Sequence, residues 1–581
     1  MKGFKLLSVG LLLMALVGSP SSLSIAEETT NVYDLTYIAS EDGAAISFVK
    51  IDGGRMALFL PSSANLSALA LHFEGGDATV VVDEQSLDIA SDEPFDLASL
   101  FPDPPADGIY SFILVQGPHR LSVKLMISAN IGSLYITSDD PANEGQAFVD
   151  QVKGNKASGK MVLLRADGST VYAGDLKQIK GRGNTTWNYP KKPYQIKLTE
   201  KIDLLETGDP TEAEKTWILL ANYYDHSLIR NALTFDLAAE LGMPYSPHSQ
   251  SVDFYYDGQY RGTYLLCEKT EISSGRVGIH DLEKDFETAN PQVEDFDGLP
   301  TDVATNAYGR KCYYVTGLND PDDISGGYLL EMDFWERADV EKSHFNSRWQ
   351  FDIVVKSPEY LSLSALSYIS EFYQDFEDAL FREGVHPETG KSYTDYVDLT
   401  SLARSYVIFE LSQNGDAYRS STFFYKPAGE EMLYAGPVWD YDTAYGLYYL
   451  NYRETEMVAA RTRMGKALIA VPSFLQAVQD IYRNELNPLV TDIVLSDDPQ
   501  AQSGRLRSIA GYSEELAASR RMNAFRWPQK RSADDEEQEE EEDPIEFLQG
   551  FIARRNEFLN ALQWEEIDAV LEQQQADSEN T

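Results

Sequence analysis

The chain has 581 residues, of which 48 are basic and 93 acidic, so its formal net charge is -45 at neutral pH. A surface with this charge repels nucleic acid and anionic lipid, and we expect neither as a partner. The length is sufficient for two or three domains with a sizeable core. Two cysteines, Cys267 and Cys312, are too few for a zinc site or a disulfide scaffold, and they either pair or stay as buried thiols.

Residues 1–26 have the features of a secretory signal peptide. Lys2 and Lys5 give a positive start, residues 6–17 are apolar, and Ser24-Ile25-Ala26 forms a small-x-small cleavage site. No later apolar run approaches the length of a membrane-spanning helix. We therefore expect a secreted protein, extracellular or associated with the cell surface, with no integral membrane segment once the signal is removed.

Residues 27–130 contain short β-type runs separated by Gly, Asp, Ser and Pro. Examples are residues 45–49, 56–60, 78–82 and 109–114. Strands at this spacing predict a small all-β sandwich. Because the region concentrates no catalytic residue types, we expect an adhesion or spacer module.

The first candidate phosphate-binding segment is residues 179–198. Gly181 and Gly183 flank Arg182, which combines close access to the backbone with one fixed cation. Lys197 lies between apolar neighbours at the end of a short alternating strand, and Lys180, Lys191 and Lys192 add positive charge. An acidic chain that binds an anionic substrate needs such a locally basic cleft. The alternative is a hairpin with a solvated arginine.

A helix is predicted over residues 227–241 from its apolar stripe, with Gly242 as its stop. Arg230 and Asn231 at its start are either functional or part of a surface salt bridge. The run 264–268 is predicted to be a buried strand joining two lobes, where Glu268 could pair with Lys197 or contact a nucleotide. Residues 283–325 are expected to be a surface insertion.

The most informative segment is residues 436–446, in which Asp440 and Asp442 are two positions apart. Clustered carboxylates suit a hard cation such as Mg²⁺. Asp416 precedes them, at the end of a helix predicted over 399–413 and before a β-type run at 421–425. A protein kinase places its catalytic base and its metal-binding Asp in this order. Each segment alone is also compatible with solvated turn residues.

The C-terminal part is predicted to be helical. Amphipathic segments are expected at 368–382, 473–488, 500–522 and 544–562. An acidic stretch at 532–543 repels itself and is expected to be a disordered loop, and residues 566–581 are expected to be a polar tail.

Taken together, six ordered blocks resemble the CotH kinase family, named for a bacterial spore-coat protein. The resemblance extends from about residue 130 to 450, with a helical continuation to about 565. The blocks are Lys180–Trp187 with Lys191–Lys197, Leu219–Asp225 with Ile229–Asn231, Gly262–Glu268, Gly326–Asp333, Asn414–Asp416 and Trp439–Asp442.

The resemblance implies an α+β fold, with an atypical, two-lobed protein-kinase-like domain over residues 131–565 that follows the β-sandwich. It implies a secreted kinase that uses ATP with Mg²⁺ or Mn²⁺ to phosphorylate Ser or Thr of a protein substrate outside the cell or at its surface. It makes Asp416 the catalytic base and Asp440 and Asp442 the metal ligands. The nucleotide-binding candidates are Lys180, Arg182, Lys197 and Glu268.

One departure from the family pattern concerns Ser421, where many members have an asparagine. Kinases generally use such an asparagine to hold a second metal ion, so either one metal suffices here or activity is reduced. This substitution, the added β module and export to a space poor in ATP favour a non-catalytic surface or spore-coat assembly scaffold as the alternative. A glycosidase ranks last, because carboxylates two positions apart on one turn do not easily flank a sugar bond.

Overall fold

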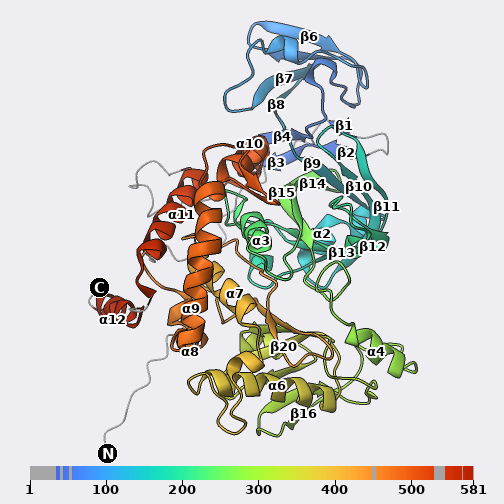
Figure 1. The fold of residues 1–581 in the computed structure, drawn as a ribbon. Coiled ribbons are helices and arrows are strands. Elements are labelled where there is room, and N and C mark those ends of the chain that lie inside the picture. Colours follow the sequence, from blue (N-terminus) through green and yellow to red (C-terminus); the bar gives the residue numbers. More distant parts are fainter. Residues whose placement is uncertain are drawn as a thin grey trace, which may run out of the picture.

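The computed structural model describes residues 35–39, 44–51, 55–447, 453–528, 543–564 and 567–579 (Figure 1). The signal peptide expected at 1–26, and the acidic loop expected at 532–543 apart from Asp543, lie outside the described residues. Along the chain, the described elements form an N-terminal sheet, a closed barrel, a second sheet and a set of helices. The mixed α+β class predicted from the sequence is confirmed at this level.

The N-terminal region is a six-stranded sheet with a two-stranded hairpin. The sheet order is β3-β4-β8-β7-β5-β6, and β4 and β8 pair in parallel. This pairing joins all six strands into one sheet, where two stacked sheets were expected. The strands are β3 (Val49–Ile51), β4 (Arg55–Leu60), β5 (Ala78–Val82), β6 (Gln85–Ile89), β7 (Tyr110–Gln116) and β8 (His119–Ile127), and the hairpin is β1 (Thr36–Ile38) with β2 (Ala45–Ser47).

The middle of the chain closes into a seven-stranded barrel in the order β10-β11-β12-β13-β15-β14-β9. Parallel pairing of β14 with β9 completes the closure. Side chains alternate along each strand, so Tyr194 and Ile196 of β12 fill the barrel interior while Gln195 and Lys197 point outward. The strands are β9 (Gly132–Ser138), β10 (Lys156–Leu164), β11 (Thr170–Gly181), β12 (Tyr194–Ile202), β13 (Glu214–Leu220), β14 (Ser249–Tyr256) and β15 (Gln259–Glu268).

The second sheet has seven strands in the order β16-β17-β19-β20-β18-β21-β22. The segment 283–325, expected to be a surface insertion, supplies most of helix α4 (Leu282–Ala289) and two strands of this sheet. The edge strand β16 is mostly exposed, but β17 is internal to the sheet and buries Cys312 and Val315, so the expectation is wrong for that strand. Helices α6 (Leu363–Leu380) and α7 (Leu399–Ser412) share a core with the sheet. The strands are β16 (Thr301–Thr305), β17 (Lys311–Val315), β18 (Tyr328–Asp333), β19 (His344–Asn346), β20 (Asp352–Ser357), β21 (Thr422–Lys426) and β22 (Tyr434–Ala435).

The helices predicted from apolar periodicity are present with shifted ends. The largest error is at residues 500–522, where the helix begins only at Ile509 because Gly504, with φ +52°, turns residues 502–507 into a short hairpin. Part of the expected polar tail is also helical. Besides α4, α6 and α7, the α-helices of the described residues are α1 (Pro141–Glu144), α2 (Gln146–Gln151), α3 (Arg230–Glu240), α5 (Trp335–Ala338), α8 (Arg463–Ile469), α9 (Pro472–Ile481), α10 (Ile509–Arg526), α11 (Pro544–Ala561) and α12 (Ile567–Glu579).

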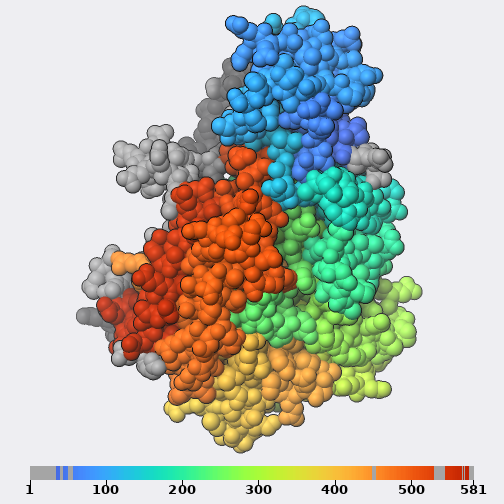
Figure 2. All heavy atoms as spheres, turned by 45° about the horizontal axis from the view of Figure 1, so that its top comes forward, coloured from blue at the N-terminus to red at the C-terminus, as the bar shows by residue number. Residues whose placement is uncertain are grey.

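Helix α10 is hydrogen-bonded to the barrel from the other end of the sequence. Ser519 Oγ donates to Asp253 Oδ2 at 2.7 Å, and Lys191 Nζ donates to Asn523 Oδ1 at 2.8 Å. All four side chains are buried. In Figure 2, the orange and red C-terminal segments lie directly against the green part of the chain. Buried polar groups of the barrel region are therefore hydrogen-bonded by a helix that lies far along the chain.

Cys267 on β15 and Cys312 on β17 are both buried and unpaired, which decides between the two alternatives left open for them. Burial raises the pKa of both thiols, that of Cys267 to about 12, so they stay protonated at neutral pH. None of the helices in the described ranges combines the length and the apolar character that a bilayer crossing requires.

Candidate active site

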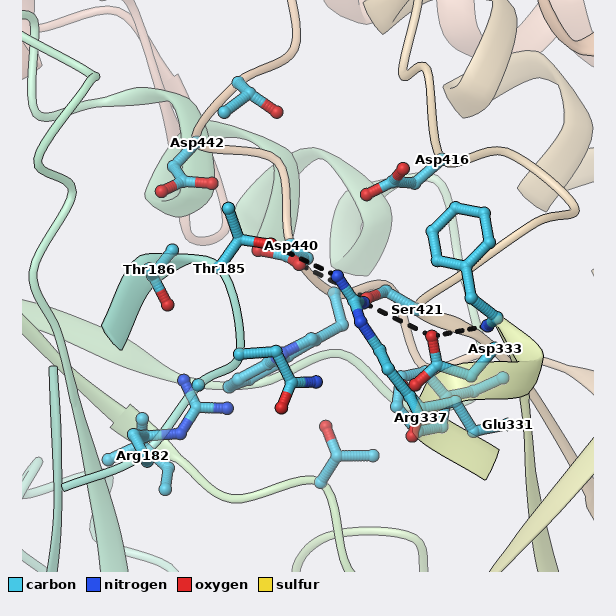
Figure 3. Close-up of a pocket in the computed structure, with 18 of the residues that line it drawn as sticks. Arg182, Thr185, Thr186, Glu331, Asp333, Arg337, Asp416, Ser421, Asp440 and Asp442 are labelled. Carbon is cyan, nitrogen blue, oxygen red and sulfur yellow. Dashed lines mark hydrogen bonds and ion pairs between the residues drawn. The ribbon is translucent and has the colours of Figure 1, made fainter. Parts of the chain in front are cut away.

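A cavity of about 520 Å³ lies between the barrel and the second sheet (Figure 3). This volume is within the range of about 300–1,000 Å³ that is typical of small-molecule sites. Most of its lining comes from three parts of the chain: the loop after β11, the end of β18 with α5 (Trp335–Ala338), and the segments that follow α7 and β22. Single residues of other segments, among them β12, β13 and β20, complete it. The lining includes Arg182, Thr185, Thr186, Glu331, Asp333, Arg337, Asp416, Ser421, Asp440 and Asp442.

Asp416 enters the cavity because α7 stops just before it. Gln413 takes a left-handed conformation, with φ +47°, and ends the helix. Asn414 Oδ1 then accepts a hydrogen bond of 3.0 Å from the backbone N–H of Asp416. The amide of Asn414 also donates to the backbone oxygen of Asp440 at 3.3 Å. Asn414 thereby joins the two acidic segments that the sequence places more than twenty residues apart.

The carboxyl groups in the cavity interact strongly. Burial, and then the charge of Asp440, raise the pKa of Asp416 to about 6. Burial, followed by Asp440 and Asp225, raises the pKa of Asp442 well above its usual range. The charges acting most on Asp442 are thus those of other carboxylates, and its side chain is buried. A buried group of carboxylates that repel one another suits a hard divalent cation, because such cations prefer carboxylate oxygens as ligands.

The loop that carries Asp440 and Asp442 is held from behind by helix α3. Asn231 Oδ1 accepts a hydrogen bond of 2.8 Å from the backbone N–H of Tyr441. Arg230 Nε donates to the backbone oxygen of Ala444 at 3.0 Å. Both side chains are buried, and Arg230 forms an ion pair of 2.5 Å with the buried Asp225. The head of this helix therefore positions the acidic loop, and the surface salt bridge considered from the sequence is not what forms.

Arg182 lies in the cavity on the barrel side, away from Asp416 in the view of Figure 3. The turn that presents it uses Gly183 at φ +78°, a backbone conformation that favours glycine. Its guanidinium carbon lies 5.3 Å from the centre of the Trp439 ring. Burial lowers the pKa of Arg182, and Asp440 and Asp442 act in the opposite direction. This cation is therefore close to the acidic loop.

The predicted lysines do not line the cavity. Lys180 and Lys197 lie on β11 and β12, outside the set of lining residues, although Gln195, two positions before Lys197, belongs to it. Lys191 is buried and donates to the backbone oxygen of Thr263 at 2.5 Å, and burial lowers its pKa to about 7. Lys192 donates to the backbone oxygen of Trp187. Of the basic residues named from the sequence, Arg182 alone is part of this lining.

Glu268 does not reach this cavity either. It is the last residue of β15 and lines a second, smaller cavity together with Glu212 and His248. Lys269 and Thr270, which follow it directly, line both cavities. The strand predicted at 264–268 is therefore present, but its terminal carboxylate points to a different place from the one expected.

Several charged residues of the cavity were not recognised from the sequence. Lys356 on β20 lies 3.6 Å from Glu331 and 3.1 Å from Glu341. Arg337 of α5 pairs with Asp333 at 3.2 Å and donates to Ser420 Oγ at 2.9 Å. A signal existed for Lys356, since it directly follows the apolar run 353–355, much as Lys197 lies between apolar neighbours.

Lys153 and Lys269 are the other cations of the lining. Burial, opposed by Lys356, raises the pKa of Glu331 to about 7. The cavity thus combines a set of carboxylates with cations from both the barrel and the second sheet. This combination suits a ligand with several negative charges that is bound together with a metal ion.

Comparison with known proteins relates the chain to a described family. No curated protein matches the chain. The family model described as CotH kinase protein matches residues 179–559, well over half of the 581 residues. The matched range contains Arg182, the segment around Asp416, and Asp440 with Asp442. The chain belongs to the CotH kinase family.

Proposed function

We propose that this protein is a kinase that transfers the γ-phosphate of ATP, with Mg²⁺ or Mn²⁺, to a Ser or Thr hydroxyl of a protein outside the cell or on its surface. One observation carries the proposal: Asp416, Asp440 and Asp442 line one cavity with Arg182, in a member of the CotH kinase family. The extracellular location rests on the composition of residues 1–26.

The metal-binding part of the proposal rests on Asp440 and Asp442. Their carboxylates are two residues apart on one loop, and Asp442 is buried where other anions raise its pKa. A divalent cation would remove this repulsion, and two protein carboxylates are a common share of an Mg²⁺ coordination sphere. When bound, the ion neutralises charge on the phosphates. Asn231 and Asn414 keep the loop in place for this task.

Asp416 is the group that we assign to the substrate hydroxyl. It faces the cavity, and its pKa of about 6 leaves it ionised at neutral pH while making it a stronger base than an ordinary aspartate. Its carboxylate orients the Ser or Thr hydroxyl and accepts the proton as the oxygen attacks phosphorus. The hydrogen bond from its backbone N–H to Asn414 fixes the turn that presents it.

Arg182 and the lysines of the lining are assigned to the phosphates. The contact of Arg182 with the Trp439 ring restricts the guanidinium before any ligand arrives. Lys153, Lys269 and Lys356 are the lysines that line the cavity, and we assign to them the task expected of Lys180 and Lys197. Most of the catalytic effect in phosphoryl transfer comes from such positioning and charge neutralisation.

The test is incorporation of labelled γ-phosphate from ATP by the chain from Glu27 onward, with Mg²⁺ or Mn²⁺ and a mixture of extracellular proteins. The Asp416→Asn variant should lose incorporation by orders of magnitude while binding the nucleotide nearly as well as the unmodified protein. Asp322→Asn is the matched control, because Asp322 is exposed and does not line the cavity, and it should retain full activity.

The alternative of a non-catalytic scaffold makes the opposite forecast. If the protein neither bound ATP in a metal-dependent way nor incorporated phosphate, the cavity would not be a nucleotide site and the scaffold function would be favoured. If Asp416→Asn transferred phosphate at the rate of the unmodified protein, the assignment of the base would be wrong even if the protein were a kinase.

A further inference from the structure

A second cavity, of about 160 Å³, brings together two carboxylates and an imidazole from distant parts of the chain. Glu212 ends the short turn of helix at Pro210–Glu212, His248 precedes β14, and Glu268 ends β15. One oxygen or nitrogen atom of each side chain lies within 4.8 Å of those of the other two. His248 Nδ1 is 3.4 Å from Glu268 Oε2 and 3.9 Å from Glu212 Oε2.

The two carboxylates are buried and the imidazole of His248 is about one-third exposed, and the group is incompletely hydrogen-bonded. The Glu268 side chain is only 4% exposed and that of Glu212 12%. Within the described residues, Glu268 Oε1 and Glu212 Oε2 accept no hydrogen bond from any other residue, so without a metal ion the two carboxyl groups can bond only to each other, through a shared proton. Leaving a buried carboxylate oxygen without a partner is costly, so a structure retains it mainly where something else occupies the site.

The neighbouring cations are committed to other groups. Arg276 pairs with Glu271 and donates to the backbone oxygen of Thr216 at 2.7 Å. Lys269 pairs with Glu271 at 2.9 Å. Both basic side chains border the cavity without forming a salt bridge to Glu212 or Glu268 among the described residues. The two buried carboxylates therefore face each other and His248 with no cation of the protein between them.

The backbone fixes the three groups before any ligand binds. The N–H of His248 donates to Glu268 Oε2 at 2.8 Å, and the N–H of Glu268 donates to the backbone oxygen of His248 at 3.2 Å. Glu212 is held on its helical turn, whose first residue is capped by Asp209. Such prior ordering of donor atoms is what a specific ion site requires.

We infer that Glu212, His248 and Glu268 bind one divalent transition-metal ion, of which Zn²⁺ is the best representative. One imidazole nitrogen with two carboxylate oxygens is a donor set that Zn²⁺ accepts, whereas Mg²⁺ prefers oxygen and water throughout. Three protein ligands would leave a fourth position of the ion open for water or another ligand. This site is separate from the one assigned to Mg²⁺ with ATP, and it does not depend on the proposed kinase activity.

The test is calorimetric titration of the chelator-treated protein with ZnCl₂ and, separately, with MgCl₂. One Zn²⁺ should bind per chain, and Mg²⁺ should not displace it. His248→Asn removes an imidazole that is about one-third exposed, so the fold should be retained. Loss of a residue that only hydrogen-bonds to a metal ligand typically lowers metal affinity by roughly 10–100-fold, and the loss of His248 as a direct ligand should lower the Zn²⁺ affinity by more than that. Glu268→Gln should have the same effect.

Two controls locate the site. His280→Asn alters an exposed histidine that is paired with Asp285, and it should leave Zn²⁺ binding unchanged. Asp442→Asn disables the first cavity and should also leave Zn²⁺ binding unchanged. Unfolding followed by circular dichroism without metal checks that each variant is folded, and Zn²⁺ should raise the unfolding temperature of the parent protein only where the three residues are intact.

Two results would overturn the inference. Zn²⁺ binding that survives in both His248→Asn and Glu268→Gln would place the ion elsewhere. No Zn²⁺ binding by the parent protein would mean that the two carboxylates share a proton and that the cavity holds no metal.

Discussion

Ser421 Oγ donates a hydrogen bond of 3.2 Å to Oδ2 of Asp440, one of the two carboxylates that we assign to metal binding. Both residues have left-handed backbone conformations, with φ of +51° and +69°. For residues other than glycine this conformation costs about 1–2 kcal/mol, and such strain concentrates at functional sites. Ser421 is thus held beside the loop to which we assign the metal ion, and the family resemblance leads us to expect an asparagine at this position for a second metal ion.

Replacing Ser421 with asparagine should increase phosphate transfer, most clearly when Mg²⁺ is limiting. The amide oxygen is a better ligand for a hard cation than a serine hydroxyl, and asparagine tolerates a positive φ well. The measurement is the rate of labelled phosphate incorporation across a range of Mg²⁺ concentrations. Ser421→Ala, which supplies no oxygen, is the comparison, and an asparagine variant that is slower at every concentration would refute the prediction.

Asp442→Asn should separate metal binding from stability. The neutral amide removes the repulsion that Asp442 experiences from Asp440 and Asp225, so the protein without ligand should unfold at the same or a higher temperature. Binding of ATP in the presence of Mg²⁺ should weaken by about tenfold or more, since a ligand is lost. Thermal unfolding with and without Mg²⁺ and ATP measures both effects. A variant that kept its full response to Mg²⁺ and ATP would contradict the assignment.

Asn231→Ala should impair the site although Asn231 lies outside the cavity lining. The change removes the acceptor for the N–H of Tyr441 and leaves that buried donor without a partner, which costs about 1–3 kcal/mol. The metal loop should become less ordered, and Mg²⁺-dependent nucleotide binding should weaken.

Asn290→Ala is the control for this change. Asn290 is also buried and donates to the backbone oxygens of Phe286 and Asn319. Its loss should cost a comparable free energy of unfolding without changing nucleotide affinity. Equal losses of affinity in the two variants would show that Asn231 acts through general stability alone.

The buried Glu377 of α6 should make the protein less stable as the pH rises. Burial raises its pKa to about 8 in the folded chain, against an ordinary value near 4.5. Between these values the folded state keeps a proton that the unfolded state releases, so the free energy of unfolding falls by about 1.4 kcal/mol per pH unit from this group. Above the folded pKa the dependence ends.

Glu377→Gln should remove this dependence, because the amide has no proton to release. The measurement is the urea concentration at the midpoint of unfolding, taken for both proteins between pH 5 and 8. As the pH rises, the midpoint of the glutamine variant should increase relative to that of the unmodified protein. Parallel curves would show that Glu377 does not titrate between these limits.

The sequence allowed several elements to be predicted because their signals are local. The helix before Asp416 was placed at 399–413 and is found at Leu399–Ser412, since an apolar repeat and a following turn determine both ends. Arg182, Asp416, Asp440 and Asp442 do line one cavity. Their types and order along the chain were enough to select them.

The remaining features depend on contacts between distant segments. Lys197 was expected in the site because it ends a strand, but the closure of the barrel determines which outward-facing residues of β12 reach the cavity, and Gln195 is the one that does. Glu268 was expected to pair with Lys197 or contact a nucleotide, because it ends a buried strand predicted to join two lobes. Its approach to His248 and Glu212 instead requires three distant segments to meet. No periodic pattern reports such a meeting.

The hydrogen bonds of helix α10 to the barrel bear on how the chain matures during synthesis. Asp253 is 266 residues from its partner Ser519, so the strands of the barrel leave the ribosome long before the helix that satisfies their buried polar groups. At about 5–20 residues per second, that interval is roughly 13–50 s. Until it ends, Asp253 and Lys191 have no helix to bond with. The nascent barrel is therefore expected to be less stable than the finished one, although Tyr260 and Thr263 already bond to Asp253. A chain stalled on the ribosome after β15 but before α10 should be cut by protease more readily than the full chain.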